Sequence, residues 1–206
     1  MRVGVTSAHK AATTGRGYLI MRRTLGFHLV KSCYGLWLPG DERGHWSSAW
    51  DDQIGYIEPH MLHDGDPVRL RMAEERMKHP PTVLDEPMTR AVAEALDHCV
   101  HQSDGGLSIA AAAIHVTHMH LLLPYSARDI DRTAKWIADQ TTKAVHRRTR
   151  HQGPVWGKGK WRVFVFDVDH WRNALRYIER HNVRKGLPER PYAWLCDPTA
   201  SQRTGA

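Results

Sequence analysis

Apolar residues along the chain alternate between two periodicities, one typical of strands and one of helices. Residues 24–35 (TLGFHLVKSCYG) alternate and carry β-branched and aromatic side chains, which predicts a first strand. Residues 107–116 and 118–125 are two short apolar runs that predict paired central strands, and residues 153–166 predict a Gly-Lys loop leading into another strand. Apolar positions at helical spacing predict three amphipathic helices, over residues 85–103, 126–151 and 167–186.

These elements follow one another as strand, helix, strand, strand, helix, strand, helix. The order predicts an α+β protein with a ferredoxin-like βαββαβ core, an antiparallel sheet like that of RNA-recognition domains, and an added C-terminal helix. Segment 38–67, rich in Gly, Pro, Asp and Trp, is expected to be a long loop insertion, followed by a short helix within 67–81. We expect one domain over 24–195, a basic N-terminal tail over 1–23 and a C-terminal tail over 196–206.

Composition adds an expectation about partners. Among 206 residues, 29 Lys and Arg stand against 22 Asp and Glu, and this net charge of +7 favours a polyanionic partner, nucleic acid first. Cys33, Cys99 and Cys196 lie far apart, so no disulfide framework is indicated and a reducing cytoplasm is expected. Histidines and hydroxyl residues interrupt the longest apolar stretch, so no membrane span is predicted.

The histidine pair in THMHLLL is the first candidate for chemistry. His118 and His120 are two residues apart, so on a strand both imidazoles point to one face and can meet one cation. Fifteen histidines predict roughly one such pair by chance, so the spacing alone is weak. The pair opens an apolar strand, where two histidines without partners are costly. The alternative is a pair of satisfied or edge histidines. His115 is expected to point elsewhere or to lie in the turn.

A tyrosine and a histidine stand together on the last predicted helix. The buried stripe of this helix is predicted at Val168, Trp171, Leu175 and Ile178. On the adjoining face Tyr177 and His181 are four residues apart and therefore lie side by side, one turn apart. Taken alone, the pattern is typical of a tyrosine at the edge of the buried face and a solvent-exposed histidine.

Taken together, the histidine pair and the tyrosine indicate phosphoryl-transfer chemistry. Two strand histidines plus a helix His or Asn can hold a divalent ion with open positions, which polarises a phosphate. A nearby tyrosine can then attack the phosphorus and form a covalent phosphotyrosine. The phenol is a modest leaving group, so a freed hydroxyl can reverse the reaction without a nucleotide cofactor.

Three segments in order resemble a known family. The segments FHLVKSCYGLWLPGDERGHW, HMH followed by leucines, and RYIERHNVRKGL are similar to those of the HUH single-tyrosine transposases, and most of all to the insertion-sequence-200-like branch called REP-associated tyrosine transposases. The resemblance runs from about Phe27 to Trp194. It implies a ferredoxin-like catalytic domain that acts on single-stranded, hairpin-forming DNA with Mg²⁺ or Mn²⁺.

The resemblance also assigns roles by position. It makes His118 and His120 metal ligands and Tyr177 the nucleophile. His181 stands where relatives have Gln or Asn as the third ligand, and Asn182 is its rival. Three imidazoles suit Mn²⁺ or another transition ion better than Mg²⁺.

A DNA-binding surface is expected beside this site. WGKGKWR (156–162) alternates aromatics, which stack on unpaired bases, with cations that follow phosphates. The alternative is a glycine turn whose tryptophans pack inward. Trp37 is read either as a base-recognition residue or as a staple of its loop. The proposed nucleic-acid-binding residues are Trp156, Lys158, Lys160, Trp161, Arg162, Arg147, Arg148, Arg184 and Lys185.

Two other functions fit parts of the sequence. A non-catalytic RNA-recognition-like binding module requires exposed aromatics on the central strands, and residues 107–116 and 118–123 contain none. A metal-dependent hydrolase of small phosphoesters requires the histidines but not Tyr177. The chain is expected to be a monomer or a homodimer, and the tyrosine helix could serve its own histidines or those of a partner subunit.

Overall fold

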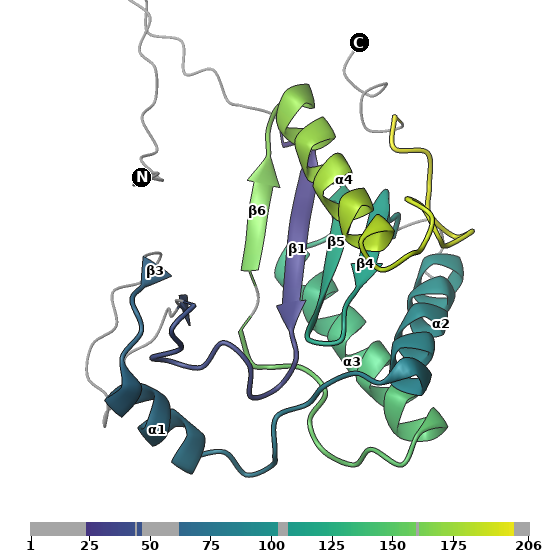
Figure 1. Ribbon diagram of the computed structural model, residues 1–206. Coiled ribbons are helices and arrows are strands. Elements are labelled where there is room, and N and C mark those ends of the chain that lie inside the picture. The colour runs from purple at the N-terminus through teal and green to yellow at the C-terminus, as the bar shows by residue number, and fades with distance from the viewer. Residues whose placement is uncertain (1–23, 44, 47–61, 103–106, 160, 200–206) are drawn as a thin grey trace, which may run out of the picture.

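A four-stranded antiparallel sheet forms the centre of the molecule (Figure 1). The computed structural model describes residues 24–43, 45–46, 62–102, 107–159 and 161–199. In the order in which they lie in the sheet, the strands are β4 (Ala111–Ile114), β5 (His118–Pro124), β1 (Gly26–Ser32) and β6 (Trp161–Val165). Each neighbouring pair is antiparallel, which confirms the predicted α+β class and the predicted pairing of the two central runs.

Helices cover both faces of this sheet. In Figure 1, α4 (Val168–Val183) crosses in front of the strands and α3 (Ile130–Arg148) runs behind them, and α2 (Glu86–Gln102) packs with α3 in one core. The short helix α1 (Pro67–Glu75) lies outside these layers, near a two-stranded sheet. That small sheet pairs β2 (His45–Trp46) with β3 (Leu62–His63). Both small strands fall within the predicted insertion 38–67, of which residues 44 and 47–61 lie outside the described residues, as does the predicted tail 1–23.

Alternation along β5 decides which residues face the site. Leu121 and Leu123 belong to the core formed with α2 and α3, whereas Leu122 packs in a separate core under α4. Because successive side chains of a strand point to opposite faces, His118 and His120 share the α4 face with Leu122. The leucines that follow the histidine pair in β5 therefore contribute side chains to both cores, one on each face of the sheet.

Local signals set the ends of α4. The side chain of Asp167 accepts a hydrogen bond from the backbone N–H of His170 at 2.7 Å, and it caps the first turn. After the last turn, Gly186 adopts a φ of +74°, a conformation that glycine tolerates best. The helix therefore lies within the predicted range 167–186.

The buried stripe of α4 includes the predicted Trp171 and Ile178 but differs from the prediction at its other positions. Val168 and Leu175 are only partly buried. The buried residues of α4 are Trp171, Ala174, Ile178 and Asn182. The small side chain of Ala174 lets the helix lie close to the sheet, and this stripe faces Leu122 and Val165. With this stripe buried, Tyr177 and His181 lie at the edge of the interface between α4 and the sheet, beside the histidines of the sheet.

The chain beyond the predicted domain end stays attached to the core. The backbone N–H of Cys196 donates to the carbonyl of Ile109 at 2.9 Å, and the indole N–H of Trp171 donates to the carbonyl of Pro198 at 3.0 Å. These bonds hold the segment after α4 against β4 and α4. None of the helices in the described ranges is long and apolar enough to span a bilayer.

Candidate active site

Imidazoles from four parts of the fold meet on the α4 face of the sheet. They are His28 of β1, His115 in the turn after β4, His118 and His120 of β5, and His181 of α4. The His118 and His120 rings are 4.7 Å apart between centroids, and the His120 and His181 rings are 4.8 Å apart. His115 lies in the turn, as one of its two expectations had it, but it does not point elsewhere, because its ring stacks on His118 at 4.8 Å with an interplanar angle of 5°.

The nitrogen atoms of this cluster fit a metal ion. His115, His118 and His181 each offer a ring nitrogen, and these atoms lie within 4.8 Å of one another. The Nε2 atoms of His120 and His181 are buried and have no hydrogen-bond partner among the described residues. A buried polar atom without a partner is unfavourable, and a bound cation satisfies a bare imidazole nitrogen. Imidazole donors are typical ligands of divalent transition ions.

Burial keeps these imidazoles neutral. It lowers the pKa of His120 from 6.5 to about 2, with further lowering by nearby His118 and His28. Burial also lowers the pKa values of His118 and His115 to about 4, with the positive charge of Lys185 contributing in both cases. Neutral imidazoles have the free lone pairs that a metal ion requires.

Acid is expected to destabilise the metal-free protein through this cluster. The pKa of His120 in the folded state lies below its ordinary value of 6.5, so the unfolded chain binds an additional proton as the pH falls. The contribution to stability is therefore full above pH 6.5 and is lost progressively as the pH falls towards 2. At about pH 5 the loss from His120 amounts to about 2 kcal/mol.

Urea unfolding of the wild type and of His120→Gln at about pH 7.5 and about pH 5 measures this effect. The variant is expected to lose about 2 kcal/mol less than the wild type between the two pH values. An equal loss in both proteins would show that His120 is not the group responsible.

Tyr177 lies directly beside the imidazoles of its own chain. Its ring centroid is 4.6 Å from that of His181 and 5.4 Å from that of His120. The side chain is 47% exposed, so its hydroxyl remains open to a substrate. The tyrosine and the histidines thus form one site within a single chain.

His181, and not Asn182, faces the histidine pair. Asn182 is only 1% exposed, and its side-chain amide donates to the carbonyl of Ala112 at 3.0 Å and to that of Glu189 at 2.9 Å. Asn182 therefore ties α4 to β4 and to the segment that follows the helix. Of the two rivals for the third ligand, the structure places His181 within reach of the other imidazoles.

Trp37 borders the cluster beside His118. It adopts a φ of +52°, an uncommon conformation for a residue other than glycine, and its ring meets His118 edge-on at 5.5 Å. The Arg43 guanidinium lies 4.7 Å above the Trp37 ring and is paired with the buried carboxylate of Asp41. This segment therefore forms a wall of the site in addition to holding its own loop.

Trp156 is not available as a base-stacking residue. Only 8% of it is exposed, it packs in the core with α2 and α3, and its indole N–H donates to the hydroxyl of Thr141 at 2.8 Å. The sequence could not separate it from Trp161, because both flank the same glycine turn. The turn itself is held by Lys31, whose ammonium donates to the carbonyls of Gly157 at 2.6 Å and Gly159 at 2.8 Å.

Trp161 lies on the same face of the sheet as the histidines. It pairs with Val30, which pairs with His120 on its other side, so all three share one row across the sheet. Trp161 is 48% exposed and Lys158 is exposed, whereas Lys160 lies outside the described residues.

The remaining basic residues divide between the two faces. Arg162 points away from the histidine face and pairs with Asp131 of α3 at 2.8 Å. Arg147 and Arg148 end α3 on that opposite side, and Arg148 pairs with Glu94 at 2.8 Å.

The residues beside the imidazoles are Arg184 and Lys185, which follow α4. Lys185 donates to the carbonyl of Ile114 at 2.6 Å.

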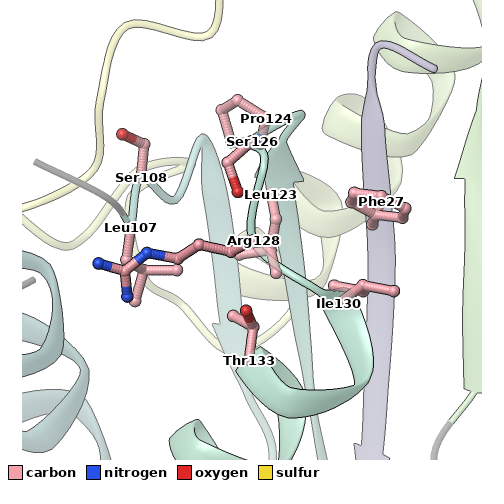
Figure 2. A pocket seen from close by; sticks show the side chains of 9 residues that line it. All are labelled: Phe27, Leu107, Ser108, Leu123, Pro124, Ser126, Arg128, Ile130 and Thr133. Carbon is pink, nitrogen blue, oxygen red and sulfur yellow. The ribbon is translucent and has the colours of Figure 1, made fainter. Parts of the chain in front are cut away.

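A small hollow lies on the other side of the sheet and does not belong to this site (Figure 2). It is lined by Phe27, Leu123 and Arg128, among others, and its interior volume of about 10 Å³ has room for about one water molecule. The imidazole cluster lies on the opposite face of the sheet, beside α4.

Comparison with known proteins gives matches to solved structures alone. No family model matches the sequence, and no curated protein matches it. A candidate transposase from Deinococcus radiodurans R1 is similar with 17% identity and a TM-score of 0.42, over 82% of this chain and 98% of that one. A REP-associated tyrosine transposase bound to a REP hairpin is similar with 12% identity and a TM-score of 0.41, over 85% of this chain and 75% of that one. The name of this second structure is also that of the transposase branch whose motifs resemble segments of this sequence.

Proposed function

We propose that the protein is a metal-dependent enzyme that cleaves and rejoins single-stranded, hairpin-forming DNA through a covalent link to Tyr177. The observation that carries the proposal is the position of the tyrosine. Its ring lies 5.4 Å from His120, whose buried Nε2 has no hydrogen-bond partner among the described residues. The strand order β4-β5-β1-β6, with helices in both crossovers, fits the ferredoxin-like core that we propose for this catalytic domain.

In the proposed reaction Tyr177 is the nucleophile. Its phenol oxygen forms a bond to the phosphorus of the scissile phosphodiester and gives up its proton, and the bond from phosphorus to the leaving strand breaks. The leaving oxygen takes a proton and becomes a free hydroxyl. Attack of a DNA hydroxyl on the phosphotyrosine reverses these changes and rejoins a strand. The exposure of Tyr177 supports this role, since a buried phenol would not reach a DNA backbone.

His118, His120 and His181 are the residues that would hold the metal ion. A bound divalent ion would polarise the scissile phosphate and offset the charge that develops on it. The chain contributes three neutral imidazoles at fixed positions, two from one strand and one from the helix that carries the tyrosine. Because α4 carries both His181 and Tyr177, the same helix aligns the ligand and the nucleophile.

The exposed residues on the histidine face supply a path for the DNA strand. Trp161 offers a ring on which an unpaired base can stack, and Lys158 lies three residues before it, next to the Gly159 turn. Arg184 and Lys185 place positive charge at the other side of the imidazoles, after the end of α4. A strand that crosses the sheet face between these groups passes Tyr177.

Incubation with labelled hairpin oligonucleotides that carry the gene's flanking sequence tests the proposal. With Mn²⁺ or Mg²⁺ we expect a labelled species that migrates with the protein on a denaturing gel, and we expect chelation to prevent it. The same sequence as a perfect duplex is the matched substrate control. Cleavage without an adduct would indicate a hydrolase, and binding without cleavage would indicate a nucleic-acid-binding module.

A further inference from the structure

We infer that His28 and His115 are positioning residues that hold the Nε2 atoms of His120 and His181 toward the metal ion. The inference rests on the metal site of the proposed function and deepens it. Each of the two residues contacts the Nδ1 atom of one ligand imidazole, and each leaves the opposite nitrogen of that imidazole unpartnered.

The first contact joins β1 to β5. His28 Nε2 lies 3.1 Å from His120 Nδ1, and the rings are 5.2 Å apart between centroids. One of the two nitrogens must carry the proton. If His120 Nδ1 donates, the buried His120 Nε2 is a bare lone pair that a cation can accept. If His28 donates, His120 Nε2 carries a proton in a buried place without an acceptor, and no cation can bind there.

The second contact joins the β4–β5 turn to α4. His115 Nε2 lies 2.9 Å from His181 Nδ1, and His181 Nε2 is buried without a partner among the described residues. The same reasoning assigns the shared proton to His181 Nδ1. His115 then uses its Nε2 as an acceptor, so it orients His181 instead of serving as a ligand through that atom.

The third ligand shows the same arrangement with a hydroxyl group. His118 Nδ1 lies 2.9 Å from the Thr117 hydroxyl oxygen, and when that hydroxyl accepts the Nδ1 proton, Nε2 is the nitrogen open to the metal. Three ligand rings thus have their Nδ1 atoms occupied by three different neighbours. Loss of such an outer partner typically costs about 10- to 100-fold in metal affinity.

The tautomers of the metal-free protein provide a direct test that does not depend on DNA cleavage. Long-range ¹H–¹⁵N correlation spectra of the full chain above pH 7 distinguish Nδ1–H from Nε2–H imidazoles. We expect the Nδ1–H form at both His120 and His181, with assignments taken from single variants. An Nε2–H form at either residue would overturn the inference for that pair. Because no DNA is present, this result is separate from success or failure of the proposed function.

Paired substitutions separate a positioning role from ligation. The amide oxygen of Gln replaces an Nε2 acceptor, so His28→Gln and His115→Gln are expected to keep Mn²⁺ affinity within a few-fold of the wild type, as measured by calorimetry. His28→Phe and His115→Ala remove the acceptor and are expected to weaken binding about 10- to 100-fold. His98→Gln, an exposed change on α2, is the matched control.

Thermal unfolding of each metal-free variant checks that the fold is retained. If His115→Gln binds as weakly as His115→Ala, His115 is a ligand and the inference is wrong for it. If all four variants bind like the wild type, neither residue positions the site. Wild-type protein that binds Mn²⁺ but never forms a DNA adduct would contradict the proposed function and leave this inference intact.

Discussion

Tyr177→Phe is expected to abolish covalent capture of DNA while leaving the protein folded and able to bind DNA. The substitution removes one hydroxyl from a side chain that is 47% exposed, so packing under α4 barely changes. The Phe ring retains the contacts with His181 and His120, whose centroids lie 4.6 Å and 5.4 Å from that of the tyrosine. Loss of a nucleophile typically lowers the rate by at least about 10³-fold.

Two measurements on the same preparations check this result. The denaturing gel reports the adduct, and fluorescence anisotropy with a labelled hairpin reports binding. Tyr125→Phe is the matched control, because Tyr125 is also exposed, at 56%, and stacks on Phe27 away from the imidazoles. If Tyr177→Phe forms as much adduct as Tyr125→Phe, a different residue is the nucleophile and the proposed mechanism fails.

Periodicity was sufficient to predict most of the fold. Strand alternation and helical spacing placed all four strands of the main sheet and the helices that cover it, because each element has a face that must be buried. For α4 the prediction placed Leu175 in the buried stripe, whereas its neighbour Ala174 is the buried residue. Sequence spacing alone cannot tell which of two adjoining faces of a helix packs on the sheet. Ala174 resolves the choice, because a small residue allows the closest approach.

The candidate site was predictable only where its residues are close in sequence. Spacing along one strand identified His118 and His120, and spacing along one helix identified Tyr177 with His181. His28 and His115 gave no such signal, because the register of β1 against β5 and the β4–β5 turn bring them to the site. Buried and exposed tryptophans of the glycine turn were equally hard to separate, since a turn has no fixed side-chain period.

Removal of His120 is expected to eliminate both tight metal binding and adduct formation. His120 is 4% exposed and contacts the rings of His118 and His181, so His120→Ala takes one of three imidazoles from the centre of the site. Because the Nε2 atom of His115 is engaged with His181 Nδ1, two imidazoles of the proposed ligand set remain, and we expect Mn²⁺ affinity to fall by at least about 100-fold. Tyr177 remains in place but lacks the charge stabilisation that makes its attack productive.

The comparison with His98→Gln distinguishes this loss from a general effect of removing a histidine. For His120→Ala we expect two losses and one retained property: weak metal binding by calorimetry with Mn²⁺, no adduct on the denaturing gel, and nearly unchanged DNA affinity by hairpin anisotropy. DNA affinity is preserved because the exposed Trp161 and Lys158 lie outside the imidazole cluster. Full adduct formation by His120→Ala in the presence of a chelator would mean that the histidine cluster is structural and that the tyrosine reacts without a metal.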